Sequence, residues 1–138
     1  FDGLPVEYHH LSKKQIGYYG FVKWMREHFH WDFAIAPLTE TPFNNGKSDL
    51  KALDYGIWGI AGIFSEVPSY QETIRNGKNG LIVPNNETAW EEALEKMASD
   101  IALRQSLSQS IGMMVRGGRT LAQHAPDWEA AVKNILNK

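Results

Sequence analysis

The sequence predicts an α/β domain of the doubly wound type, built on a parallel sheet of about four strands. Short, almost continuously apolar runs recur along the chain, and a segment with helical spacing separates each run from the next. Strands buried on both faces have this composition, and their alternation with helices is typical of parallel sheets. The length of 138 residues suits a single domain.

Four segments are expected to be strands. They cover residues 6–10, 33–36, 60–65 and 80–84, of which the last three are apolar runs. Pro37 ends the second segment, because proline has no backbone N–H to give to a sheet. A polar segment, residues 11–17, is expected to be a loop between the first strand and the first helix.

Six segments have the spacing or the start and stop signals of helices. They cover residues 18–30, 46–56, 69–76, 87–98, 101–115 and 127–136. Asn86 and Asp100 are expected to cap the fourth and fifth helices, because short polar side chains accept hydrogen bonds from first-turn N–H groups. Asn76-Gly77 is expected to stop the third helix, and Gly117-Gly118 to interrupt the chain before the last.

Composition narrows the class of protein. With 43% apolar residues, 22% charged residues and a net charge of −2, the chain resembles an ordinary globular protein without a basic footprint for nucleic acid. It has no cysteine, which fits a reducing compartment, and the localisation expected is cytoplasmic. The longest apolar stretch, residues 57–64, is shorter than the ~20 residues of a membrane-spanning helix. The start at Phe1, close to a turn-like Gly3-Leu4-Pro5, suggests a piece of a longer protein, truncated at its N-terminus.

The ligand site of such a fold is expected beyond the carboxyl ends of the strands. The loops that begin there cover residues 38–47, 65–70 and 84–87. The first of them is polar, rich in turn formers, and leads into a helix expected to begin Lys47-Ser48-Asp49. A helix start offers unpaired N–H groups and a partial positive charge, which together attract anions.

The helix after this loop presents charges along one side. Lys47 and Lys51 lie one turn apart, and Asp54 follows three residues later. This order suits a diphosphate joined to a ribose, with the cations on the phosphates and the carboxylate on the hydroxyls. The alternative is a solvated face on which Lys51 and Asp54 pair, an interaction worth about 0.3 kcal/mol. Lysines in a first turn oppose the helix dipole, which favours an anion there.

The opposite side of the same helix carries Leu50, Leu53 and Ile57 at i, i+3 and i+7. This spacing predicts that these three side chains face the core.

These residues carry a resemblance to a known family. Residues 32–38, 42–44 and 47–56 resemble the donor-binding, C-terminal half of GT-B glycosyltransferases, above all the group 1 (family 4) retaining enzymes. The likeness covers about residues 18–135, and its specificity lies in the order and spacing of the elements. It continues through Gly59, Tyr70, Gly77, Asn79, Gly80, Trp90 and Arg104. It implies a Rossmann-like fold with residues 1–138 as the donor-binding domain, and an acceptor domain that would precede Phe1.

The resemblance also implies a function. It is the transfer of a sugar from a nucleoside-diphosphate sugar, UDP- or GDP-linked, to a glycan, lipid or other acceptor, as in polysaccharide biosynthesis. No metal or further cofactor is expected. The expected partners are the donor and the acceptor domain of the same enzyme, without nucleic acid or an indicated membrane contact. The isolated domain is expected to bind donor weakly and to be inactive in transfer.

Family members use two glutamates separated by seven residues, the first on the transferred sugar and the second on the nucleotide ribose. Asp54 falls at the second position with a shorter side chain, but Gly46 stands at the first. The sequence therefore departs from the family at the sugar end. Glu40 or Asn44, from the same loop, could supply a sugar contact.

The phosphate end matches the family more closely. Lys47, Ser48 and Lys51 fall where a subset of these enzymes holds the diphosphate. Tyr70 lies in a loop after a strand and could line the base or sugar pocket. Catalysis would be largely electrostatic, through stabilisation of the departing diphosphate. No catalytic residue is assigned, since the family's Arg/Lys pair would precede Phe1.

Two other classes remain open on the residues alone. A receiver-like or other non-catalytic α/β module is one, although Asp32 stands at the start of its strand, where a phospho-acceptor would not. A nucleotide-sugar epimerase with the same fold is the other. No His, Asp or Glu grouping has the spacing of metal ligands, and the glycines form no G-x-G-x-x-G motif after a strand.

Overall fold

The computed structural model describes residues 5, 7–14, 16–28 and 30–136. It contains two compact units, Phe1–His30 and Trp31–Lys138. The described part of the first unit holds one helix, α1 (Tyr18–His28), which buries Met25. α1 ends at His28, whose ring nitrogen Nδ1 is 2.8 Å from the carbonyl oxygen of Trp24. The first expected helix is therefore confirmed.

The strand expected at residues 6–10 is wrong over residues 7–10, which form neither helix nor strand; residue 6 lies outside the described residues. No described strand pairs with this segment. Instead the His9 ring packs edge-on against Trp24 and His28 of α1, at centroid distances of 5.5 and 5.9 Å. The backbone N–H and C=O groups of a segment without a neighbouring strand cannot form the hydrogen bonds of a sheet.

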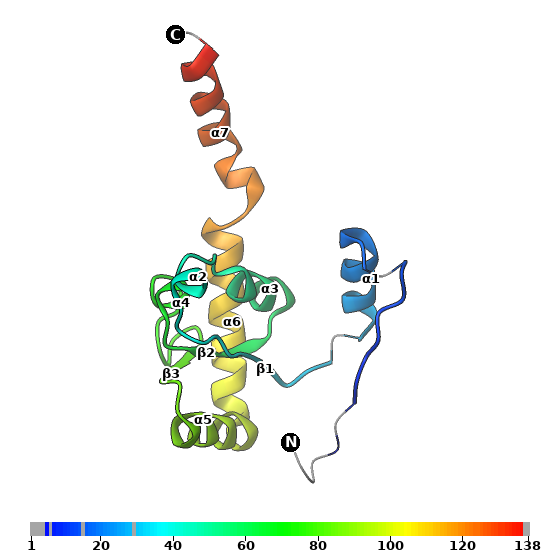
Figure 1. Ribbon diagram of the computed structural model, residues 1–138, viewed down its shortest axis with the longest axis vertical. Helices are drawn as coiled ribbons and strands as arrows, with labels where there is room; N and C mark the ends of the chain where they lie inside the picture. Colours follow the sequence, from blue (N-terminus) through cyan, green and yellow to red (C-terminus); the bar gives the residue numbers. More distant parts are fainter. Residues whose placement is uncertain (1–4, 6, 15, 29, 137–138) are drawn as a thin grey trace. The chain divides into compact units, whose positions relative to one another are not determined.

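The second unit is built on a parallel sheet (Figure 1). Its strands are β1 (Phe33–Ala36), β2 (Ala61–Ser65) and β3 (Leu81–Val83), in the order β1-β2-β3. The protein is thus a mixed α/β protein, as predicted, although the described sheet has three strands, not about four. All five residues of the central strand β2 are buried, as expected for a strand covered on both faces.

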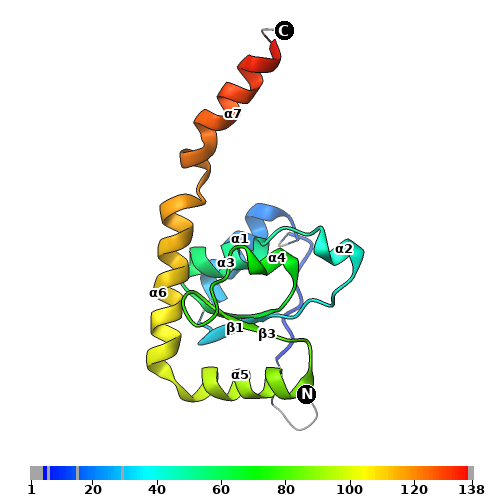
Figure 2. The same cartoon turned by 90° about the vertical axis from the view of Figure 1, so that its left-hand side faces the viewer.

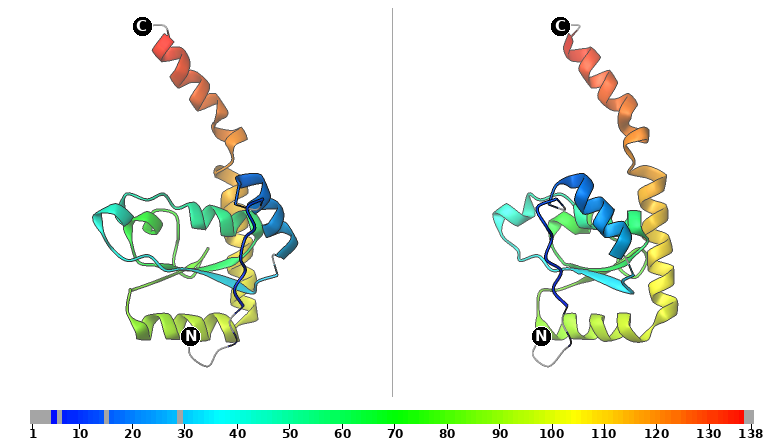
Figure 3. Two further views of the ribbon diagram at one scale, coloured as in Figure 1. Left: turned by 45° about the vertical axis from the view of Figure 1, so that its right-hand side comes forward. Right: turned by 90° about the vertical axis from the view of Figure 1, so that its right-hand side faces the viewer.

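Helices cover both faces of the sheet. They are α2 (Pro42–Asn45), α3 (Leu50–Trp58), α4 (Pro68–Gln71), α5 (Glu87–Ser99), α6 (Ile101–Gly118) and α7 (Leu121–Leu136). Figures 2 and 3 show α3 and α4 on one side of the sheet and α5 on the other, with α6 running beside it. Among the described residues, no helix is both long and apolar enough to cross a membrane.

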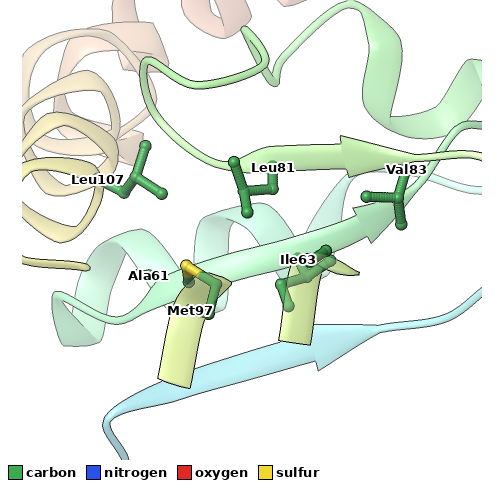
Figure 4. Close-up of a cluster of buried hydrophobic side chains, with 7 residues drawn as sticks. Ala61, Ile63, Leu81, Val83, Met97 and Leu107 are labelled. Atoms are coloured by element: carbon green, nitrogen blue, oxygen red, sulfur yellow. The ribbon is translucent and has the colours of Figure 1, made fainter. Parts of the chain in front are cut away.

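The main core lies between the sheet and α5 and α6 (Figure 4). Its buried members come from β2, β3 and both helices: Ala61, Ile63, Leu81, Val83, Ala93, Met97 and Leu107. The side chains of Ile63, Met97 and Leu107 are fully buried. Burying a side chain of this size contributes roughly 1.5–3 kcal/mol, so this cluster fixes α5 and α6 on the sheet.

The two predicted caps place the ends of these helices. Asn86 Oδ1 accepts from the N–H of Ala89 at 3.0 Å, and Asp100 Oδ1 accepts from the N–H of Leu103 at 2.8 Å. Both caps are confirmed. At the far end, α6 continues to Gly118, three residues beyond the predicted end, and α7 begins at Leu121, before the predicted 127.

The early start of α7 has a local cause. The N–H of Thr120 donates to Gln123 Oε1 at 3.1 Å, and the Thr120 hydroxyl donates to the same oxygen at 2.8 Å. These bonds hold the backbone as a capping box does. The helix expected at residues 69–76 is shorter, α4 (Pro68–Gln71). The Asn79 side chain binds the backbone that would continue it: its Oδ1 accepts from the Arg75 N–H at 2.6 Å, and its Nδ2 donates to the Thr73 carbonyl oxygen at 3.1 Å.

The prediction for the buried face of α3 is wrong. Leu50 and Ile57 are 57% and 59% exposed and Leu53 is half-buried, whereas the buried residues of the helix are Ala52, Tyr55 and Gly56. The glycine explains the rotation. A Cβ at Gly56 would lie 2.4 Å from Val115 Cγ2 and 3.0 Å from the Ile111 carbonyl oxygen of α6, so only glycine permits this approach. Interhelix contact therefore overrides the aliphatic spacing of the sequence.

Gly56→Ala tests this approach. We expect the variant to lose about 1–3 kcal/mol of unfolding free energy, because the added methyl group meets backbone as well as a side chain. Urea denaturation would measure the loss. Gly117→Ala is the matched control: it lies in α6 with no atom within 4 Å of a Cβ, and alanine favours helix by up to about 1 kcal/mol. Equal stability of Gly56→Ala and wild type would contradict the packing argument.

Candidate functional site

The loops at the carboxyl ends of the strands converge, as the sequence predicts. The N–H of Leu38, after β1, donates to Ser65 Oγ at the end of β2 at 2.7 Å. Asn85, after β3, donates from Nδ2 to the Leu38 carbonyl oxygen at 2.9 Å. Ser69 Oγ donates to the Asn44 carbonyl oxygen at 2.7 Å. One edge of the sheet therefore carries all three loops.

A cavity of about 390 Å³ opens at this edge, between the end of β1 and the start of α3. Its lining has an apolar side and a cationic side: Ile35, Ala36, Pro37, Leu38, Lys47, Ser48, Leu50, Lys51 and Tyr70. We call it the β1–α3 cavity. It brings together four of the binding residues predicted from the sequence: Lys47, Ser48, Lys51 and Tyr70.

The helix at the cavity starts later than predicted. α3 begins at Leu50, so that Lys47 and Ser48 lie in the preceding loop and Lys51 in the first turn. Asp49 occupies the N-cap position, but its side chain makes no capping hydrogen bond. The first-turn N–H groups of α3 are therefore not taken by the side chain that normally takes them. One of them, the Ala52 N–H, donates to the Asp49 carbonyl oxygen at 2.8 Å. An anion in the cavity would find the remaining first-turn N–H groups and two ammonium groups.

The loop between β1 and α3 is held by its own bonds. Thr41 Oγ1 accepts from the N–H of Asn44 at 3.1 Å, capping the short helix α2, and Asn44 Nδ2 donates to the Thr39 carbonyl oxygen at 2.7 Å. Lys47 Nζ lies 5.0 Å from the ring centroid of Phe43, within cation–π range. Asn44 therefore serves the loop. It and the exposed Glu40 are not among the described residues that line the β1–α3 cavity.

Asp54 lies one turn further along α3, outside the lining of the cavity. Its Oδ2 is 3.3 Å from Lys51 Nζ, and the two side chains are 30% and 54% exposed. This is the pair that the solvated-face alternative requires. A surface pair of this kind contributes little to stability, so either partner can exchange it for a ligand at small cost.

Tyr70 lines the β1–α3 cavity. It is 5% exposed, and its ring packs 5.1 Å from that of Phe64. Burial, followed by the negative charge of Asp49, raises the pKa of the Tyr70 hydroxyl above its ordinary value. The group is therefore neutral at physiological pH and can donate a hydrogen bond.

Beside the cavity, Asp49 forms a charge cluster that sequence reasoning missed. Arg119, at the end of α6, binds its carboxylate through two nitrogens, Nη1 to Oδ2 at 2.9 Å and Nη2 to Oδ1 at 3.0 Å. The Thr73 hydroxyl donates to the same carboxylate. Burial would raise the pKa of Asp49, but the bonds from Arg119 and Thr73 and the charge of Arg119 outweigh it and lower the pKa.

A second cavity, of about 340 Å³, lies on this side and shares Lys47 and Ser48 with the first. Its lining is almost wholly polar: Asn45, Lys47, Ser48, Asp49, Pro68, Ser69, Glu72, Thr73 and Arg119. We call it the α3–α6 cavity. Lys47 and Ser48 therefore line both cavities. The start of α3 lines the β1–α3 cavity, and the Asp49–Arg119 pair lines the α3–α6 cavity.

Other titratable groups have structural roles. Tyr55 donates from its hydroxyl to the Ile35 carbonyl oxygen at 2.7 Å, and burial, with the nearby Tyr70 and Asp54, raises its pKa to about 12. Asp32, directly before β1, lies 3.6 Å from Arg104 of α6. Among the described residues, no group of three His, Asp or Glu side chains is placed to hold a metal ion.

Comparisons of the chain with protein-family models, with curated proteins and with solved structures find no match. The function proposed for the site therefore rests on the site's own residues. Its features are a basic, partly apolar cavity and an uncapped helix start.

Asp49→Asn tests the charge cluster through pH. The folded pKa lies below the ordinary 3.8, so the stabilisation is complete above that value and disappears as the pH falls through the folded pKa. We expect Asp49→Asn to lose about 1–2 kcal/mol at pH 7, and the gap from wild type to narrow below about pH 4. Urea unfolding at several pH values would measure it.

Asp54→Asn is the matched control, because it removes a carboxylate from a more exposed ion pair on the same helix. Its effect should stay within about 0.5 kcal/mol at every pH. A gap between Asp49→Asn and wild type that is the same at pH 3 and pH 7 would contradict the interpretation.

Proposed function

We propose that this chain is the donor-binding half of a GT-B glycosyltransferase and that a nucleoside-diphosphate sugar binds in the β1–α3 cavity. The observation that carries the proposal is that Lys47, Lys51 and the uncapped start of α3 meet at one cavity. The parallel sheet with helices on both faces supports the doubly wound, Rossmann-like part of the proposal. In such folds ligands bind at the carboxyl edge of the sheet, where this cavity lies.

The charges of the cavity suit a diphosphate. Two ammonium groups and the positive end of a helix dipole oppose two or more negative charges on the ligand. Ser48, next to Lys47, adds a hydroxyl at the same place. The cavity, at about 390 Å³, falls in the size range of small-molecule sites. Its apolar side, formed by the end of β1 and Leu50, is available to a base or a ribose face.

The structure offers more candidate contacts for the nucleotide end of the donor than for its sugar end. Asp54 stands one turn beyond Lys51, and its carboxylate can accept hydrogen bonds from ribose hydroxyls if Lys51 turns to phosphate. At the sugar end, Gly46 stands where the resembling enzymes have a glutamate, and Asn44 and Glu40 lie outside the cavity lining. The proposal is therefore strongest for the nucleotide diphosphate.

The proposed chemistry is electrostatic. The bond between the anomeric carbon and the diphosphate oxygen breaks, and the charge that develops on the departing diphosphate is stabilised by Lys47, Lys51 and the N–H groups of α3. The neutral hydroxyl of Tyr70 can donate a further hydrogen bond. An acceptor hydroxyl, brought by the other half of the enzyme, forms the new bond at the anomeric carbon, and its proton passes to the oxygen of the departing diphosphate.

Calorimetric titration of this chain with UDP and GDP tests the proposal. We expect millimolar to high-micromolar dissociation constants for one of the two, and at least tenfold weaker binding by Lys47→Ala/Lys51→Ala. Removing two phosphate contacts predicts a loss of this size, about 1.4 kcal/mol or more. Binding should weaken as salt is added, because phosphate contacts are screened.

Lys133→Ala is the matched control. Lys133 lies on α7, is 67% exposed and pairs with Glu129 one turn away at 2.6 Å, as Lys51 pairs with Asp54. The control should bind like wild type. No heat from either nucleotide at millimolar concentration, or equal losses in the control and the double variant, would overturn the proposal.

A further inference from the structure

We infer that Arg119 is a positioning residue: it keeps the start of α3 open to an anion by holding the Asp49 carboxylate away from it. The inference rests on the proposed function only in that the anion is taken to be the donor's diphosphate. The geometry concerns Asp49, Thr73, Arg119 and the first turn of α3, and it can be tested without any nucleotide.

The N-cap of α3 differs from two other N-caps of the chain. Among the described helices, three are preceded by Asn or Asp at the N-cap: Asn86 before α5, Asp100 before α6 and Asp49 before α3. The first two accept from N–H groups of their helices at 3.0 and 2.8 Å, as such residues normally do. Asp49 does not, and its backbone angles, φ −77° and ψ 27°, lie outside the extended region in which Asn86 and Asp100 are found.

The Asp49 carboxylate is held by two residues outside α3. Both of its oxygens bind the Arg119 guanidinium, at 2.9 and 3.0 Å, and Thr73 donates a further hydrogen bond. The side chain of Asp49 is only 11% exposed. Asp49 and Arg119 line the α3–α6 cavity, whereas the β1–α3 cavity is lined by their neighbours Lys47, Ser48 and Lys51. The carboxylate is therefore turned to the other side of the Lys47-Ser48 loop.

Loss of Arg119 changes what this carboxylate can bind. It would lose two charge-assisted hydrogen bonds, and the N–H at the second position of α3, that of Lys51, is a donor that an N-cap side chain accepts from. The N–H at the third position, that of Ala52, already donates to the Asp49 carbonyl oxygen at 2.8 Å. Turning to the Lys51 N–H would bring a negative charge to the site that a phosphate is proposed to use. Asp49 would then compete with the ligand by capping its own helix.

Three variants test the inference, with inorganic pyrophosphate as the probe: Arg119→Gln, Asp49→Ala and the double variant. We expect Arg119→Gln to weaken binding roughly three- to tenfold, an effect of the size that charges have at helix ends. The double variant should recover wild-type affinity within about twofold, because the competing carboxylate is gone. Arg116→Gln removes the same charge from the last turn of α6 and should bind like wild type.

Amide NMR of the unliganded chain gives a readout that a merely structural role would not move. In Arg119→Gln, the amide proton of Lys51 should shift downfield and exchange more slowly, because a side-chain carboxylate now accepts from it. In the double variant both changes should disappear. Thr73→Val, which removes one of the carboxylate's partners, should give a smaller change in the same direction and serves if Arg119→Gln does not fold.

The outcomes separate this inference from the proposed function. If wild type binds neither pyrophosphate nor nucleotide but the amide shifts appear and reverse, the proposed function fails and the positioning role of Arg119 stands. An unchanged Lys51 amide overturns the inference. So does a loss of pyrophosphate affinity in Arg119→Gln that Asp49→Ala does not reverse, because Arg119 would then contact the anion itself.

Discussion

The close approach of α3 to α6 at Gly56 is the constraint on which the rest of the second unit depends. Because this position has no Cβ, the two helix backbones come together and α3 is rotated so that Tyr55 turns inward. The centroid of the Tyr55 ring then lies 5.5 Å from that of Phe64 in β2, and the Tyr55 hydroxyl donates a hydrogen bond to the Ile35 carbonyl oxygen of β1. Lys51 stands one turn before Tyr55 on the same side of α3, and its side chain lines the β1–α3 cavity at the edge of the sheet where the loops converge.

Features encoded within a few residues could be predicted from the sequence. The caps at Asn86 and Asp100 were predictable because an N-cap bond joins residues only three apart. The strands in the second unit were predictable because continuous apolar runs bounded by turn formers have few alternatives in a parallel sheet. The same locality explains the site: Lys47, Ser48 and Lys51 fall within five positions, so any structure that begins a helix there brings them together.

Features that depend on distant contacts could not be predicted. Arg119 reaches Asp49 across 70 positions, and nothing near Asp49 distinguishes it from an ordinary cap. The leucine spacing of α3 predicted the wrong face, because the deciding contact is with Val115, on a helix that starts more than forty residues later. Residues 6–10 have the composition of a strand, but pairing requires a neighbour that composition does not reveal.

The helix α6 joins two parts of the molecule that differ in how easily they open. Leu107, near its middle, is fully buried in the core, whereas Arg119 stands at its C-cap and is 36% exposed. Helix ends fray at a much lower free energy than the whole protein unfolds. Opening of the C-cap at Arg119 alone is therefore enough to release the Asp49 carboxylate while Val115 and the core stay packed. The state of the helix start at α3 is thus governed by a local opening equilibrium and not by global stability.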